Sequence, residues 1–296
     1  MQKKSVIFFT QNQWAFGQIH HALIKRLTAY GIYAHLLDFY KEYTHEEYNY
    51  LCAKFETFVT TPEAVARLMH YGIPPERIVA IAHAERDVAG GVATSSTSVF
   101  NRLKAFGVIN PRLSEQARQL GITREASIVR NGLDFDHYYA PVSCGLRVVG
   151  YAGADYHPMS NNKDCKRAYL LDSVLSGSKL MFKRHPAINH LCMAGYYQTV
   201  DAVLVTSNYE ACGLPAMEAA AAGRLAISAA VGYFDGSHGA LCRLPDDEFV
   251  ADAREALQKY QDPQLYKDTC EKAQQYARDN YDWKHVIDDW VRLITF

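Results

Sequence analysis

The stretch that decides the fold is residues 201–228, which read DAVLVTSNYEACGLPAMEAAAAGRLAIS. Residues 202–205 form a short apolar, β-branched run that is typical of a buried strand. After a polar loop, residues 214–222 are strong helix formers with a proline in the first turn, and Gly223 follows where a left-handed cap ends a helix. Residues 225–227 read as a second buried strand. Two wholly apolar strands joined by a helix predict a parallel sheet covered on both faces, and hence an α/β fold.

Two carboxylates flank the predicted start of this helix. Glu210 lies in the loop after the first strand, and Glu218 lies about one turn into the helix. Between them, the backbone N–H groups of Gly213 and Leu214 begin the helix, and a helix N-terminus attracts anions such as phosphate. The carboxyl ends of parallel strands are also where open α/β sheets bind ligands. The stretch therefore predicts a site for a ligand with phosphate in its middle and hydroxyl groups on both sides, such as a nucleotide-sugar.

The spacing from Glu210 to Glu218, inside YEACGLPAMEAAAAG, resembles the Glu–x7–Glu signature of retaining glycosyltransferases of the GT-B fold, the large family 4 group. The resemblance implies that Glu210 acts on the donor sugar and that Glu218 holds the ribose hydroxyls. It also implies that the backbone of Gly213 and Leu214 meets the pyrophosphate, and we include Cys212 in the same site. A well-capped helix with a favourable acid in its first turns is the alternative explanation.

The same resemblance implies two Rossmann-like domains facing a cleft. The 296 residues suffice for two α/β domains, each with its own core. We expect an N-terminal acceptor-binding domain at residues 1–141 and a C-terminal nucleotide-sugar-binding domain at 146–280. A last helix at 281–296 is expected to cross back to the first domain.

In the first domain the resemblance assigns two residues. Gly17 ends the loop after the first strand, where the family has a glycine-rich loop that closes over the donor phosphates and the acceptor; a plain strand-to-helix turn is the alternative. His83 follows a buried strand, like the His of a His–Asp or His–Glu pair that faces the donor sugar. A neutral imidazole there could hydrogen-bond a sugar hydroxyl or the transferring oxygen. A His satisfied by local backbone is the alternative.

The family's phosphate-binding Arg and Lys are matched only in part. Lys163 matches the Lys, at the start of a helix that we expect to run to about Leu175. Gly153 and Ala154 stand where the family has Gly-Arg, so the Arg is missing. Three residues could supply the second positive charge: Lys166, Arg167 and Lys183. A solvated basic helix start is the alternative for this cluster.

Two further motifs depart from the family pattern or compete with it. Residues 134–136 form an Asp-x-Asp, which holds a divalent metal in the other large glycosyltransferase fold. They follow Asn-Gly at the expected end of a domain, so we interpret them as a turn and expect no metal. Residues 231–235, VGYFD, lack the second glycine and the proline of the common Val-Gly-Gly-x-Pro-Glu.

Composition argues against several classes of protein. The net charge of -1 gives no basic surplus of the kind that nucleic-acid binding needs. Seven cysteines with no C-x-x-C pair indicate neither a disulfide framework nor a zinc site. No apolar run reaches membrane-spanning length, and the first residues do not read as a secretory signal. We expect a cytoplasmic protein, with peripheral contact at the inner face of a membrane left open.

We therefore expect a retaining, metal-independent glycosyltransferase that moves a hexosyl or pentosyl group from a UDP- or GDP-linked sugar to a hydroxyl of a carbohydrate or glycolipid. It would serve glycan, lipopolysaccharide or glycoconjugate synthesis and need no cofactor beyond this co-substrate. Two alternatives are a non-catalytic GT-B-like protein that binds a nucleotide-sugar or carbohydrate, and a glycosyltransferase acting on modified DNA bases. A dehydrogenase or epimerase is disfavoured, because no G-x-G-x-x-G follows the first strand.

Overall fold

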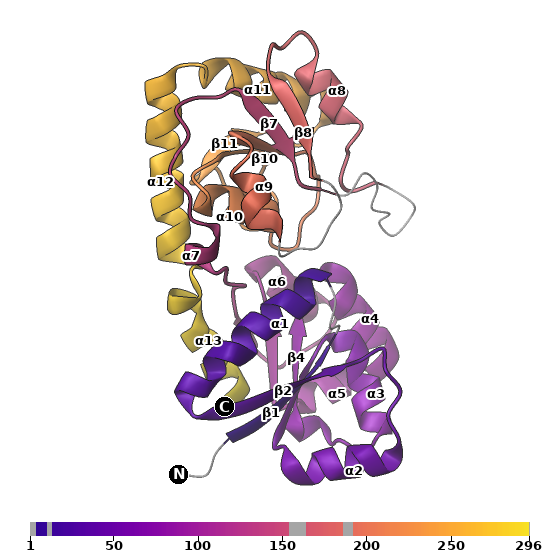
Figure 1. Cartoon of the computed structure of the whole chain (residues 1–296). Helices are drawn as coiled ribbons and strands as arrows, with labels where there is room; N and C mark the ends of the chain where they lie inside the picture. The colour runs from indigo at the N-terminus through magenta and orange to yellow at the C-terminus, as the bar shows by residue number, and fades with distance from the viewer. Residues whose placement is uncertain (1–3, 11–13, 154–163, 186–191, 296) are drawn as a thin grey trace. The chain divides into compact units, whose positions relative to one another are not determined.

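The computed structural model describes residues 4–10, 14–153, 164–185 and 192–295 (Figure 1). The chain divides into two compact units. The first unit comprises Met1–Gly132 with Lys284–Phe296, and the second comprises Leu133–Trp283.

Six parallel strands form the sheet in the described part of the first unit, in the order β2-β1-β3-β4-β5-β6. The strands are β1 (Lys4–Thr10), β2 (Ile32–Asp38), β3 (Thr57–Thr60), β4 (Ile78–Ala82), β5 (Ala105–Val108) and β6 (Ala126–Ile128). The helices are α1 (Trp14–Leu27), α2 (His45–Lys54), α3 (Val65–His70), α4 (Glu85–Ser95), α5 (Thr97–Arg102), α6 (Pro111–Gln119) and α13 (Trp283–Thr295). Strands β3, β4 and β5 are buried at every residue, as a parallel sheet covered on both faces requires.

Five parallel strands form the sheet in the described part of the second unit, in the order β11-β10-β9-β7-β8. The strands are β7 (Val148–Tyr151), β8 (Met181–Arg184), β9 (Ala202–Val205), β10 (Leu225–Ala229) and β11 (Gly239–Cys242). The helices are α7 (Phe135–Tyr138), α8 (Leu170–Leu175), α9 (Met193–Tyr197), α10 (Leu214–Ala221), α11 (Asp246–Lys259) and α12 (Pro263–Tyr281). The strand–helix–strand unit predicted from residues 201–228 is confirmed as β9, α10 and β10.

Successive residues of β9 pack on opposite faces of this sheet. Ala202 and Leu204 join a core with residues of α8 and α11, whereas Val203 and Val205 join a core with residues of α9, α10 and α12. Side chains alternate across a strand, so an apolar residue at every position means that both faces are covered. This burial explains why the strand reads as a continuous apolar run, and Figure 1 shows helices on both sides of the sheet.

The boundary between the units lies earlier than the sequence predicted. The first domain was expected to end at residue 141, but the second unit begins at Leu133. The N–H of Leu133 donates to the carbonyl of Tyr281 at 2.8 Å, and the N–H of Trp283 donates to the carbonyl of Leu133 at 3.2 Å. Phe135 and Tyr138 are buried in the same core as α10. The start of the second unit is therefore fixed against its own end.

Two predicted helix starts are wrong. Helix α1 begins at Trp14, so Gly17 lies in its first turn and not in a loop. Helix α8 begins only at Leu170, because Arg167 adopts a left-handed backbone with a φ of 48° that no α-helix can contain. Helix α13 belongs to the first unit, where the indole N–H of Trp290 donates to the carbonyl of Arg130 at 2.7 Å. In the part of the chain that is described, no helix is both long enough and apolar enough to cross a membrane.

Candidate functional site

The loop that follows β9, residues 206–213, is bound to the residues that precede α8. The hydroxyl of Thr206 donates to the carbonyl of Lys166 at 2.6 Å. The N–H of Asn208 donates to the carbonyl of Cys165 at 3.0 Å. The loop therefore has a defined path between the end of its strand and the start of α10.

Arg167 fastens this loop to the segment after β11. The side chain is only 2% exposed. Its Nε donates to the carbonyl of Thr206 at 2.6 Å, and its Nη1 donates to the carbonyl of Leu244 at 2.5 Å and to the carboxylate of Asp246 at 2.8 Å. The guanidinium also lies 5.1 Å from the ring centre of Phe249. Because its Nε and Nη1 hold the loop after β9 to the segment after β11, we assign Arg167 to the loop; its Nη2 has no hydrogen-bond partner among the described residues.

Glu210 contacts a serine of its own loop and a lysine of the segment before α8. The Nζ of Lys166 lies 2.5 Å from the Oε1 of Glu210, and the two side chains are only 19% and 12% exposed. The hydroxyl of Ser207 donates to the same Oε1 at 2.6 Å. Of the three residues that could supply the second positive charge, Lys166 is therefore the one that lies against Glu210.

The start of α10 presents the backbone N–H groups of Gly213 and Leu214. Gly213 takes a left-handed conformation, with φ 76° and ψ 48°, that glycine adopts without steric cost. Its carbonyl accepts from the N–H of Ala216 at 3.0 Å. Within the described residues, the N–H groups of Gly213 and Leu214 have no hydrogen-bond acceptor. Such groups at a helix N-terminus, together with the helix dipole, favour an anionic ligand.

Gly232 packs against this helix start. Its φ is 62°, and a Cβ at this position would lie 2.4 Å from the carbonyl carbon of Cys212 and 2.7 Å from the nitrogen of Gly213. The neighbouring Tyr233 donates its N–H to the carbonyl of Cys212 at 2.9 Å. The motif VGYFD thus keeps the one glycine that the close approach to α10 requires.

We expect Gly232→Ala to destabilise the protein and to weaken anion binding at α10. A left-handed alanine costs about 1–2 kcal/mol, and the added methyl group would collide with backbone atoms that cannot rotate away. Gly177→Ala is the matched control, because Gly177 has a φ of 78° with nothing within 4 Å of the added Cβ. Urea unfolding of both variants would measure the difference, and equal losses in the two would show that the contact with Cys212 is unimportant.

Glu218 lies between two tyrosines in the core of the second unit. It is 4% exposed. The hydroxyl of Tyr138 donates to its Oε1 at 2.9 Å, and the hydroxyl of Tyr197 donates to its Oε2 at 2.8 Å. Burial raises the pKa of Glu218 to about 7, and the hydrogen bonds from Tyr197 and Tyr138 oppose that rise. A ribose hydroxyl would therefore have to join or replace a tyrosine hydroxyl at this carboxylate.

His83 lies in the first unit, directly after β4, and is 1% exposed. Its ring centre lies 5.9 Å from that of His20 and 6.5 Å from that of Trp290. Burial, with a smaller effect of His20, lowers the pKa of His83 well below its ordinary value of 6.5. The imidazole is thus neutral at physiological pH, as a hydrogen-bonding role would require. The following residue is not the acidic partner of a His–Asp pair; instead, Asp87 accepts the backbone N–H of His83 at 2.8 Å.

The remaining predictions concern Lys163, Lys183 and residues 134–136. Lys163 lies outside the described residues. Lys183 lies on the edge strand β8 with an exposed side chain, while its carbonyl accepts from the hydroxyl of Tyr196 at 3.0 Å. Residues 134–136 were interpreted as a turn; in the structure Asp134 precedes the short helix α7, and its carbonyl accepts from the N–H of His137 at 3.0 Å. In the described part of the chain, no group of three His, Cys, Asp or Glu residues could hold a metal ion.

Comparison with known proteins finds similarity in structure and none in sequence. No protein-family model matches the sequence, and no curated protein matches it. Solved structures, in contrast, match along its whole length. The catalytic domain of starch synthase IV from Arabidopsis thaliana, bound to ADP and acarbose, has a TM-score of 0.73 at 11% identity and covers 100% of this chain and 99% of its own. The chain has the GT-B fold.

Two further GT-B structures give the same result. Sucrose-phosphate synthase from Thermosynechococcus elongatus has a TM-score of 0.71 at 14% identity, over 99% of this chain and 98% of that one. HepE from Anabaena, in complex with UDP and glucose, has a TM-score of 0.69 at 14% identity, over 99% of both chains. At such low identity the similarity establishes the fold, and the chemistry must be argued from the residues.

Several residues that organise the candidate site were not found from the sequence. They are Tyr138, Tyr197, Ser207 and Gly232. A glutamate in an alanine-rich, fully buried helix signals that hydrogen-bond donors must surround it, but not where in the chain they are. Only Gly232 left a direct signal, because it is the glycine that remains of the family's glycine pair.

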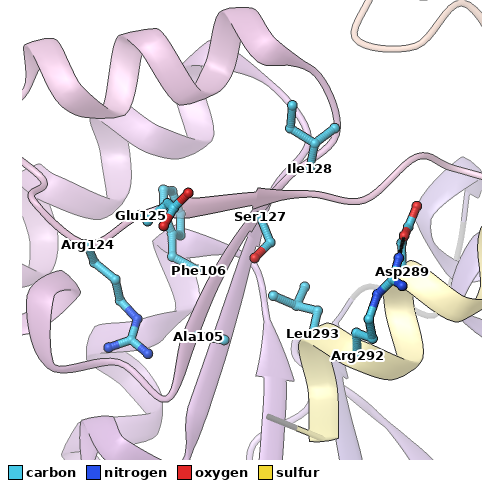
Figure 2. Close-up of a pocket in the computed structure, with 9 residues that line it drawn as sticks. All are labelled: Ala105, Phe106, Arg124, Glu125, Ser127, Ile128, Asp289, Arg292 and Leu293. Atoms are coloured by element: carbon cyan, nitrogen blue, oxygen red, sulfur yellow. Dashed lines mark hydrogen bonds and ion pairs between the residues drawn. The ribbon is translucent and has the colours of Figure 1, made fainter.

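A separate pocket of about 580 Å³ lies in the first unit and contains none of the predicted site residues. It is lined by the start of β5, by β6 and by the end of α13. Figure 2 shows Ser127 pointing from β6 toward Leu293 of α13, with Arg124 and Arg292 among the charged residues around it. Arg292 pairs with Asp289 of its own helix, and Arg124 donates to the carbonyl of Lys104. These charges are already engaged, so the pocket does not compete with the loop after β9 as the candidate site.

Proposed function

We propose that this protein is a retaining glycosyltransferase that moves a sugar from a UDP- or GDP-linked donor to an acceptor hydroxyl. The observation that carries the proposal is the combination found after β9. A loop held by buried contacts presents a Lys166–Glu210 pair next to two backbone N–H groups at the start of α10. In a GT-B chain, such a combination suits a ligand with a diphosphate between a sugar and a nucleoside.

In the proposed complex, the N–H groups of Gly213 and Leu214 and the ammonium of Lys166 bind the diphosphate. Glu210 orients the donor sugar through hydrogen bonds to its hydroxyls. Glu218 contacts the ribose, with Tyr138 and Tyr197 holding its carboxylate in place. Lys163 and Lys183 are proposed as further positive charges near the donor. Two amides and a lysine stabilise the negative charge of a departing diphosphate, so the proposal includes no obligatory metal.

The proposed reaction breaks the bond between the anomeric carbon and the diphosphate oxygen and forms a bond from that carbon to the acceptor oxygen. The acceptor hydroxyl gives its proton to the departing diphosphate oxygen. Attack from the face on which the diphosphate leaves retains the anomeric configuration. The first unit supplies the acceptor side, with His83 proposed as a neutral hydrogen-bonding group and Gly17 in the first turn of α1.

The proposal is tested by calorimetry with a panel of UDP- and GDP-linked sugars, followed by assays of slow donor hydrolysis in EDTA. At least one donor should bind, and Lys166→Met should weaken it by roughly ten- to a hundredfold, because a charged hydrogen bond contributes about 1.5–3 kcal/mol. Lys259→Met, at the exposed end of α11, is the control and should bind as wild type does. Failure of every donor to bind would count against the proposal.

The same assays distinguish a transferase from a protein that only binds the donor. The missing family Arg at Gly153–Ala154 would suit a GT-B-like protein that binds a nucleotide-sugar and does not transfer it. Donor binding with neither hydrolysis nor transfer to any acceptor would therefore favour the non-catalytic alternative. Release of free sugar with retained configuration, followed by NMR, would favour the transferase.

A further inference from the structure

A group of aromatic residues follows β2 in the first unit, with Tyr40 exposed and Phe39 and Tyr43 half-buried. Phe39, Tyr40 and Tyr43, here called the tyrosine shelf, lie in the loop that joins β2 to α2 (Figure 1). Tyr40 is 67% exposed. Its ring centre lies 4.2 Å from that of Phe39, with 38° between the planes. Tyr50 of α2 is 61% exposed, so exposure alone does not distinguish Tyr40; its packing and its position in the fold do.

The loop that carries the shelf is held rigidly. Arg67 donates to the carbonyls of Phe39 and Lys41, the latter at 2.9 Å. The carboxylate of Asp38 accepts the N–H of Tyr40 at 3.0 Å. Because these bonds fix the backbone on both sides of Tyr40, the side chain is presented to solvent at little further entropic cost on binding.

Aromatic packing supports the shelf from behind. The ring of Phe39 meets Phe9 of β1 edge-on, with 6.2 Å between the centres. The ring of Tyr43 meets Tyr48 at 5.6 Å, and Tyr48 in turn stacks on Tyr71 with centres 3.7 Å apart. The shelf is therefore the outer edge of a packed aromatic cluster, which limits its freedom to turn inward.

The shelf lies at the edge of the first sheet that carries the carboxyl ends of its strands. Strands β2 and β4 belong to the same parallel sheet, so their carboxyl ends lie at one edge. The shelf begins directly after β2, and His83 directly follows β4. Open α/β sheets bind their ligands at this edge. The position thus matches that of a substrate contact of the first unit.

The charge around the shelf restricts what can bind there. Residues 38–47 carry four carboxylates against one lysine, and Arg67, which holds the loop, adds one further positive charge. This excess of negative charge disfavours nucleic acids, anionic lipids and acidic glycans. The large apolar residues exposed between positions 30 and 50 are all tyrosines, with no aliphatic side chain that would enter a lipid layer. Tyrosine offers an apolar face and a polar edge, which is also the character of a pyranose ring.

We propose that the tyrosine shelf binds a sugar unit of a neutral oligosaccharide acceptor by stacking. The proposal rests on the proposed glycosyltransferase function and adds the class of acceptor: an uncharged glycan of several pyranose units, one of which lies on Tyr40.

The test is calorimetry of the full chain, without donor, against maltohexaose, cellohexaose and chitohexaose. At least one should bind, and Tyr40→Ala should weaken it by about three- to tenfold, the loss expected for one aromatic stacking contact. Tyr40→Phe keeps the ring and should remain within about twofold of wild type. Tyr50→Ala, an exposed tyrosine of α2 beyond the shelf, is the matched control and should bind as wild type does.

Any of three other outcomes would overturn the inference. These outcomes are no binding of any of the three glycans, binding that Tyr40→Ala leaves unchanged, or cosedimentation with phosphatidylglycerol vesicles that Tyr40→Ala abolishes. The donor panel distinguishes this failure from failure of the proposed function. Donor binding without glycan binding removes the shelf and leaves the transferase, whereas glycan binding without any donor leaves a carbohydrate site and removes the transferase.

Discussion

Arg167→Met should lower the free energy of unfolding by about 3 kcal/mol, a large effect for a single substitution. The guanidinium is 2% exposed and donates to the carbonyls of Thr206 and Leu244. Methionine fills a similar volume but leaves the buried carbonyl of Thr206 and the partly buried carbonyl of Leu244 without this donor. Each buried polar group that loses its partner costs about 1–3 kcal/mol. The loop after β9 should loosen at the same time, because Thr206 is its first residue.

Urea denaturation followed by circular dichroism would measure this loss. Arg254→Met is the matched control, since Arg254 also donates to a carbonyl, that of Ser173, but is exposed on α11. The control should cost less than about 1 kcal/mol, as exposed hydrogen bonds generally do. Similar losses in both variants would contradict the structural role of Arg167 and would return it to the list of phosphate ligands.

The contrast between Arg167 and α10 shows what local sequence can predict. Residues 214–223 carry a complete local pattern of helix formers ended by a glycine, and the structure places α10 at Leu214–Ala221 with Gly223 at a φ of 67°. Residues 163–175 carry the same kind of pattern, yet the helix starts at Leu170. The difference is tertiary, because Arg167 reaches carbonyls that are distant in the sequence, and its backbone turns left-handed.

The candidate-site residues show the same difference between local sequence signals and tertiary contacts. The spacing of Glu210 and Glu218 marks both acids as part of one strand–loop–helix unit, and that unit is confirmed. Their partners come from other segments. Lys166 reaches Glu210 across 44 positions of sequence, and Tyr138 reaches Glu218 across 80. Periodicity and capping rules act over a few residues only, so they cannot predict such pairs.

Because of Glu218, the free energy of unfolding of the wild-type protein should fall as the pH rises. Glu218→Gln should remove this fall. Burial raises the pKa of Glu218 from 4.5 to about 7 in the folded state. Between these two values the unfolded chain has released the proton that the folded chain still binds. Stability therefore falls as the pH rises through this window and is constant above it, with a total change of about 3 kcal/mol. Glutamine carries no proton to lose, and its amide can still hydrogen-bond both tyrosine hydroxyls.

The measurement is the difference in unfolding free energy between Glu218→Gln and wild type at several pH values from 4.5 to 8. The difference is needed because other buried groups titrate in the same range. Burial lowers the pKa of His20 to about 3 and that of His238 to about 4, so these groups add stability as the pH rises. Burial also raises the pKa of Asp87 to about 6, which has the same sign as Glu218. Subtraction removes all three contributions.

We expect the variant to gain about 3 kcal/mol on wild type between pH 4.5 and 8. A difference that stays constant with pH would mean that Glu218 is ionised throughout and that its tyrosine hydrogen bonds outweigh burial. Nucleotide affinity of the same variant decides the second role of this residue. If a ribose hydroxyl binds the same carboxylate as Tyr138 and Tyr197, Glu218→Gln should stabilise the fold at pH 8 and weaken nucleotide binding. Both effects are expected of a charged group that binds a ligand and whose burial lowers the stability of the fold.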